Sequence, residues 1–294
     1  MAAAPTLKEA LRRYRAQPHD LDWLSVACDI VAMDMWDDEA WFELAASQLR
    51  LARANGTLSW LPFTLDYLAE NHVQAGELSK AAALRTEREG VDPGTREATL
   101  PYVPLLLAAW RGDGPGLAGL AGEMTRGASD RGEGAALTYT DYAQAVLHNG
   151  LGNYGAAADA AHRASAVDEM VLSPWALYEL TEAAARSDQH ERACAAADQL
   201  ARLAVASGSN WARGAAARSR ALVSGGRAAE AAPIWSTANG CAGASGGSRP
   251  VISCGPRSTR SRPWAPRPSP SAPGESSWPP ARRCASAPTT PAPT

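Results

Sequence analysis

The sequence predicts an all-α protein assembled from repeated pairs of helices. Ala, Leu, Glu and Arg dominate positions 1–234. The alternation of polar and β-branched residues that is typical of strands is missing from that stretch. Five polar turns recur within it, each followed by an Ala-rich segment: AGELSKAAAL, RGDGPGLAGL, LGNYGAAADAAHRA, RSDQHERACAAADQL and SGGRAAEAA.

These turns align on Gly76, Gly112, Gly152, Asp188 and Gly226. The spacings are 36, 40, 36 and 38, a period typical of helix-pair repeats of the tetratricopeptide (TPR) class. Small alanines let neighbouring helices approach closely, while a single pair cannot bury its apolar face alone. Residues 1–232 are therefore expected to form a TPR-like α-solenoid, with an irregular helical bundle as the alternative.

Caps and breakers place the first helices. Thr6 and Glu9 form a capping-box pattern before ALRRYRAQ, and Pro18 is expected to end that helix. The segment EAWFELAASQLRLARA follows the N-cap candidate Asp37 and ends at Gly56, a typical C-terminal residue. Two helices are therefore expected within residues 1–56.

Two later helices also have clear ends. Residues 58–75 are expected to be helical up to Gly76. Ser173 followed by Pro174 reads as an N-cap with proline in the first turn, which opens WALYELTEAAARS. Each predicted helix therefore meets a turn at one of its ends.

The charge of the chain divides near residue 233. Residues 1–234 hold 21 basic and 30 acidic side chains, whereas residues 235–294 hold 7 basic and 1 acidic. An acidic body repels a phosphate backbone, so we expect no direct DNA binding by the helical part. The remainder, rich in Pro, Ser, Ala and Arg, lacks the residues of a core, and residues 233–294 are expected to be a disordered tail.

Catalytic and metal-binding constellations are not recognisable. The five histidines form no H-E-x-x-H or i, i+4 pair, and the five cysteines form no C-x-x-C pair. No nucleophile elbow is present, and the acidic pairs read as caps or solvated faces. We therefore expect a protein that is not an enzyme and has no cofactor, catalytic residues or metal ligands.

Binding residues are expected on the first helix of each repeat, which usually lines the concave groove of a solenoid. A protein partner or a small-molecule effector is the expected occupant. The candidate groove contacts are Tyr67, Asn71, Tyr142, Asn149, Trp175 and Glu179.

A cytoplasmic location is expected from the N-terminus. The segment MAAAPTLKEALRRYR has no apolar stretch of signal-peptide type. The longest apolar run, around residues 103–110, is too short to span a bilayer, so no membrane association is expected.

Five segments carry a resemblance to a known family. DDEAWFELAASQLRLARANGTLSWLPFTLDYLAENHVQAGE, LLLAAWRGD, AVLHNGLGNYGAAADAA, LSPWALYELTEAAARS and NWARGAAARSRALVSGG together resemble the helical region of large LuxR-type transcription regulators from high-GC actinobacteria. The resemblance covers most of residues 20–232. It implies that the repeats would lie between an ATP-binding module and a helix-turn-helix, and would couple effector or partner binding to transcription control.

Both flanking modules of that family are missing from this sequence. No G-x-x-x-x-G-K-[ST] loop precedes the repeats, and no helix-turn-helix pattern follows them. The tail holds three Trp and three Cys, which is odd for a linker. Read in a shifted frame, PWAPRPSPSAPGESS permits MGAEAFAERARREL, which is similar to family segments upstream of the DNA-binding domain. We therefore expect a truncated, frameshifted C-terminus, with a genuine linker as the alternative.

Three functions remain open at this level. The sensor or regulatory part of a LuxR-type regulator is the leading hypothesis. A stand-alone TPR-like interaction scaffold and an inactive gene fragment are the alternatives.

Overall fold

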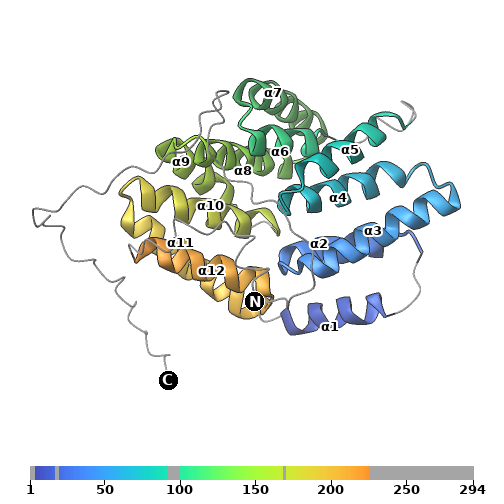
Figure 1. Cartoon of the computed structure of the whole chain (residues 1–294), viewed down its shortest axis with the longest axis horizontal. Helices are drawn as coiled ribbons and strands as arrows, with labels where there is room; N and C mark the ends of the chain where they lie inside the picture. The colour runs from blue at the N-terminus through green and yellow to red at the C-terminus, as the bar shows by residue number, and fades with distance from the viewer. Residues whose placement is uncertain (1–3, 17–19, 92–99, 168–169, 225–294) are drawn as a thin grey trace, which may run out of the picture.

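The computed structural model describes residues 4–16, 20–91, 100–167 and 170–224. Over these ranges the chain forms twelve α-helices and no strand (Figure 1), which confirms the all-α prediction. The predicted disordered tail at residues 233–294 lies outside the described residues, as does the aligned turn at Gly226.

The helices follow one another along the chain. They are α1 (Ala4–Arg15), α2 (Trp23–Asp34), α3 (Asp38–Asn55), α4 (Leu61–Gln74), α5 (Leu78–Glu89), α6 (Tyr102–Arg111), α7 (Gly114–Arg131), α8 (Ala135–Gly150), α9 (Tyr154–Ala166), α10 (Leu172–Arg186), α11 (His190–Ser207) and α12 (Asn210–Val223).

Four of the aligned turns contain a residue in the left-handed backbone conformation. Gly76, Gly112, Gly152 and Asp188 have φ of 70°, 73°, 76° and 59°, and they join α4 to α5, α6 to α7, α8 to α9 and α10 to α11. Glycine adopts this left-handed conformation without steric cost, and Asp tolerates it better than most residues. The sequence alignment therefore identified four turns of the same kind correctly.

A fifth turn of this kind escaped the alignment. Trp36 joins α2 to α3 with φ of 53°, about one repeat length before Gly76. Its side chain is only 4% exposed, so packing of the indole holds a backbone conformation that a bulky residue rarely adopts. The pairing of helices thus begins one unit earlier than the sequence indicated.

The predicted helix ends are partly right. Asp37 accepts a hydrogen bond from the Ala40 amide at 3.0 Å, and Gly56 ends α3 in the left-handed conformation, as expected. The predicted cap at Thr6 is wrong, because α1 starts at Ala4. Ser173 is likewise not a cap: α10 starts at Leu172, and the Ser173 hydroxyl donates to the Val167 carbonyl.

The later helices form an inner and an outer row. Along the inner row α4 packs on α6, α6 on α8, α8 on α10 and α10 on α12. Helices α5, α7, α9 and α11 each bridge two inner neighbours. Five buried alanines of α9 let that helix approach α8 and α10 closely: Ala157, Ala158, Ala160, Ala161 and Ala164.

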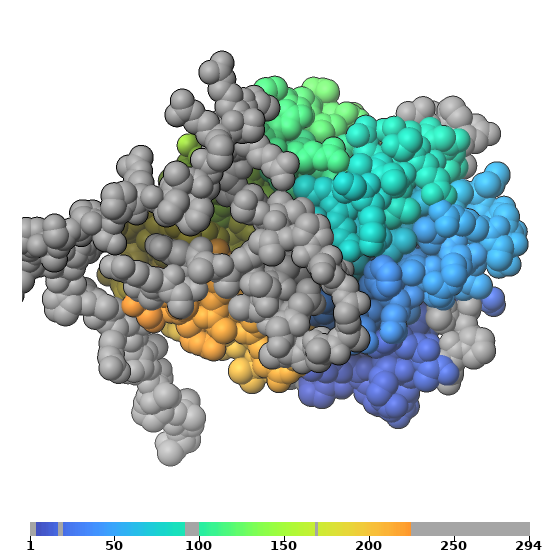
Figure 2. Space-filling model, viewed as in Figure 1, coloured from blue at the N-terminus to red at the C-terminus, as the bar shows by residue number. Residues whose placement is uncertain are grey.

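The two rows curve until the ends of the array meet. Helix α1 contacts α11, and the Ser207 hydroxyl donates to the Met35 carbonyl. The backbone amide of Val171 donates to Asp34 Oδ1 at 3.1 Å. The blue N-terminal helices and the orange C-terminal helices lie side by side along the lower edge of the molecule in Figure 2. The helical array is therefore closed on itself.

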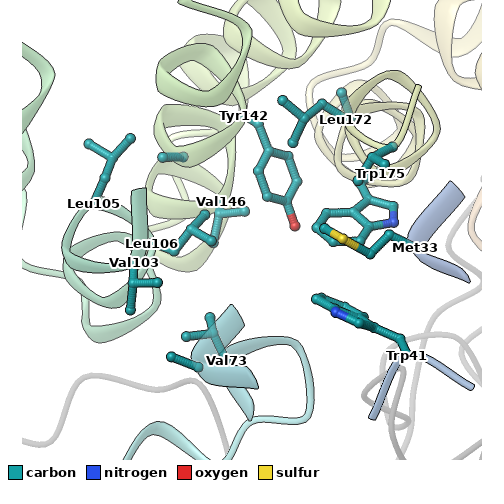
Figure 3. Close-up of a cluster of buried hydrophobic side chains, with 14 of the residues drawn as sticks. Met33, Trp41, Val73, Val103, Leu105, Leu106, Tyr142, Val146, Leu172 and Trp175 are labelled. Carbon is teal, nitrogen blue, oxygen red and sulfur yellow. The ribbon is translucent and has the colours of Figure 1, made fainter. Parts of the chain in front are cut away.

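Aromatic rings fill much of the centre. Trp175 on α10 lies 5.8 Å from Trp41, 5.9 Å from Tyr142 and 6.0 Å from Trp211, measured between ring centroids. None of these four side chains is more than 3% exposed. Figure 3 shows Trp41, Tyr142 and Trp175 converging with Met33. This aromatic cluster joins α3, α8, α10 and α12 in one core.

Candidate functional site

A cavity of about 630 Å³ opens where the inner row is interrupted. Helix α2 does not pack along α4 as α4 packs along α6. The space left between them is closed by α8 and by the start of α10. Its wall consists of Ile30, Met33, Phe63, Asp66, Tyr67, Glu70, Tyr102, Glu133, Ala135, Tyr139, Met170, Val171 and Leu172.

Helix α4 supplies one face of this cavity. Phe63, Asp66, Tyr67 and Glu70 follow the three- and four-residue spacing that brings side chains to one side of a helix. Pro62 lies in the first turn, where its missing amide hydrogen costs no helical hydrogen bond. The sequence of α4 therefore builds a mixed acidic and aromatic wall on a regular helix.

Glu70 is the most deeply buried carboxyl group of that wall. Its side chain is only 7% exposed, and the hydroxyl of Tyr139 donates a hydrogen bond to it. Burial raises the pKa of Glu70 to about 8, and the neighbouring carboxyl of Asp66 adds to this, while the Tyr139 hydrogen bond acts in the opposite direction. Glu70 therefore exchanges its proton close to neutral pH.

The other two carboxyl groups of the wall have partners. Asp66 Oδ2 accepts from Arg88 Nε of α5 at 2.7 Å, and both side chains are about one-fifth exposed. Burial nevertheless raises the pKa of Asp66 to about 6. The Tyr102 hydroxyl donates to Glu133 Oε1, and the rings of Tyr102 and Tyr139 lie 4.6 Å apart between centroids.

The electrostatic character of the cavity is acidic. Among the described residues, its wall contains three carboxyl groups and no Lys, Arg or His side chain. A fourth carboxyl, that of Asp29 on α2, is fully buried next to wall residue Ile30, and its burial raises its pKa to about 7 against a smaller opposing effect of the Gln48 amide. Such a recess disfavours an anionic occupant.

The candidate groove residues from the sequence lie in three places. Tyr67 lines the cavity, and Asn71 is buried on the same helix outside its wall. Tyr142 and Trp175 belong to the aromatic cluster, where the Tyr142 hydroxyl accepts from Gln74 Nε2 at 3.3 Å. These two side chains therefore contact core residues of this chain.

Asn149 and Glu179 form a contact between α8 and α10. Asn149 Nδ2 donates to Glu179 Oε2 at 2.7 Å and to the Glu179 carbonyl at 3.0 Å. Burial raises the pKa of Glu179 to about 7. Neither residue lies in the cavity wall, so the structure separates this pair from Tyr67.

Sequence reasoning missed most of the cavity wall. Glu70, Tyr102 and Tyr139 read as ordinary polar-face residues, because nothing local shows that three helices bring them together. One signal was available: the face formed by Phe63, Tyr67 and Glu70 mixes aromatic and acidic residues at helical spacing, whereas a solvated face is rarely aromatic.

Metal ligands do not gather in the described part of the chain. No group of three or more His, Cys, Asp or Glu side chains is placed to hold a metal ion within the described ranges. None of the described helices combines the length and apolar composition needed to cross a bilayer.

The chain matches no family model, and neither a curated protein nor a solved structure is significantly similar to it.

Proposed function

We propose that this protein is a TPR-like helical-repeat module that binds a small-molecule effector in the cavity between α2, α4 and α8. The observation that carries the proposal is a recess of about 630 Å³ in which carboxyl and aromatic side chains converge from separate helices. Ligand sites typically have volumes of about 300–1,000 Å³, with apolar walls and a few well-placed polar groups.

The closed array favours a small molecule over an extended peptide. A peptide in a solenoid groove needs a row of accessible inner-helix side chains. Here Tyr142 and Trp175 are each only 3% exposed and are packed within the core. The wall of the cavity, in contrast, comes from only a few turns of each helix, which suits a compact ligand.

The regulatory part of the proposal rests on the resemblance to LuxR-type regulators. In that interpretation the ligand is an effector, and its binding is coupled to DNA binding by a helix-turn-helix encoded downstream in a shifted frame. DNA sequencing across codons 225–294 and beyond tests this. A shifted frame that runs into a helix-turn-helix supports the regulator, whereas a single sensible frame supports a stand-alone module.

Binding itself is tested by thermal shift with a panel of cationic, neutral and anionic small molecules. At least one class is expected to raise the melting temperature. Ala135→Trp adds an indole to the cavity wall and should abolish the shift. Ala156→Trp is the matched control, since Ala156 is also an exposed alanine early in a helix but lies outside the cavity. The absence of any shift, or equal shifts in both variants, would overturn the proposal.

A further inference from the structure

We propose that the ligand of this cavity is an amphiphilic organic cation: an amine or quaternary ammonium head beside Glu70 and the tyrosines, with an apolar body against Ile30, Met33 and Met170. This inference rests on the proposed function and names the chemical class of the effector.

The carboxyl groups of the wall favour a ligand with a positive charge. Asp66, Glu70 and Glu133 all line the cavity, and Arg88, which contacts this wall, is engaged by Asp66. A carboxylate buried as deeply as Glu70 is costly unless a positive charge faces it. An ammonium group in the cavity supplies that charge, whereas an anion would add repulsion.

The aromatic residues select the kind of cation. Phe63, Tyr67, Tyr102 and Tyr139 all line the same space. Aromatic rings stabilise an ammonium group through their quadrupoles, most strongly where the cation is desolvated. A bare metal ion would instead need several oxygen ligands at short range, and no three His, Cys, Asp or Glu side chains of the described residues are grouped closely enough to hold one. The wall therefore suits a cation with an organic surface.

The apolar residues of the wall favour a ligand that also carries an apolar group. Ile30, Met33, Met170 and Leu172 are the larger apolar side chains of the wall. Met33 and Leu172 belong to the buried core and appear in Figure 3, whereas Met170 is half exposed. Methionine side chains adapt to irregular apolar shapes. A small hydrophilic cation would make no apolar contact with this part of the wall, so the best match carries a hydrocarbon or aromatic group.

An aromatic strip extends this surface outward. Phe63 of the wall lies 6.3 Å from Trp60, and Trp60 lies 5.5 Å from Trp23, between ring centroids. Trp23 is 73% exposed. The strip gives a longer apolar group a continuous path from the cavity to the surface of the protein.

Ligand binding is expected to depend on pH through Glu70. The groups that act on its carboxyl are the hydroxyl of Tyr139 on α8, which donates to it, and the carboxyl of Asp66 on α4, which repels its charge. Tyr67, Tyr102, Glu133 and the Asp66–Arg88 ion pair line or adjoin the same cavity. A bound cation favours the ionised carboxylate, so affinity should rise as the pH is raised through about 8.

The test compares three probes that differ only in their head group: phenethylamine, phenethyl alcohol and hydrocinnamate. Affinities of the full chain are measured by calorimetry. Phenethylamine is expected to bind at least about tenfold more tightly than the other two, a difference of about 1.4 kcal/mol. Glu70→Gln should remove this preference, because it keeps the shape and the hydrogen bond with Tyr139 but not the charge.

Glu179→Gln is the matched control. Glu179 is also a buried glutamate with a raised pKa, but it lies outside the cavity wall and bonds to Asn149. Its variant should keep the preference for the amine. Equal binding of the alcohol or the acid by the wild-type chain would overturn the cation inference and leave the effector site standing. Binding of no member of the wider charged and neutral panel would overturn the proposed function as well.

Discussion

The indole rings of Trp36 and Trp211 lie 4.7 Å apart between centroids, although one residue belongs to the α2–α3 turn and the other to the last described helix. This contact closes the helical array. It joins the end of α2 to α12, and Trp211 also lies 6.0 Å from Trp175 of α10 between ring centroids. Both α2 and α10 border the cavity. The shape of the proposed site therefore depends on packing between the two ends of the array.

Removal of this contact should destabilise the whole domain. Trp211→Ala is expected to lower the free energy of unfolding by about 3–5 kcal/mol, because it leaves a large void beside Trp36 and Trp175. Urea unfolding followed by circular dichroism measures this. Trp23→Ala is the control, since Trp23 is 73% exposed and should cost far less. Equal losses in the two variants would contradict the role assigned to closure.

Replacing glycine by alanine should have opposite effects on stability in a left-handed turn and inside a helix. Gly76→Ala should destabilise the protein by about 1–2 kcal/mol, because φ of 70° strains an alanine although no atom lies near its new methyl group. Gly119→Ala should stabilise it by about 0.5–1 kcal/mol, because Gly119 lies inside α7 and also has open space around it. Thermal unfolding distinguishes the two, and a loss of stability in both would contradict the backbone argument.

The buried carboxyl groups set the pH dependence of stability. The pKa of Glu70 rises from 4.5 to about 8 on folding, and the pKa of Asp29 rises from 3.8 to about 7. At a pH between the unfolded and the folded pKa of each group, the folded state holds more protons than the unfolded state. The free energy of unfolding therefore falls as the pH rises through that range. Unfolding free energies should be larger at about pH 5 than at about pH 8.

Glu70→Gln tests that assignment, because glutamine does not titrate. The variant should show a shallower fall of the unfolding free energy between the same two pH values, and Glu179→Gln should do the same through the raised pKa of Glu179. A slope identical to that of the wild type in both variants would show that other groups carry the pH dependence.

Most helix ends and turns could be predicted from the sequence, because they depend on residues close together in the chain. Gly76, Gly112 and Gly152 mark turns that need a left-handed residue, and Asp37 marks a cap through its short side chain. Trp36 could not be recognised as a turn residue in the same way. Its conformation is held by contacts with Trp211, which no local pattern contains.

The cavity depends on longer-range geometry. The sequence could place Tyr67 on an inner helix. The residues that line the cavity with it lie two helix pairs further along the chain: Tyr139 is in α8, and Glu133 lies just before α8. Small rotations between successive helix pairs decide whether such residues meet. The burial of Tyr142 and Trp175 follows from the same closure, since an open array would have left their helices facing a groove.

The measurement that tests the central claim most directly is calorimetric titration with phenethyltrimethylammonium at about pH 7, in two buffers of different ionisation enthalpy. The charge of this probe does not titrate, so any proton released on binding comes from the protein and is taken up by the buffer. The account predicts release of up to about one proton per ligand by the wild-type chain, from Glu70, and markedly less by Glu70→Gln. Binding with no proton release, or with equal release by the variant, would contradict the role of Glu70 in a cation site.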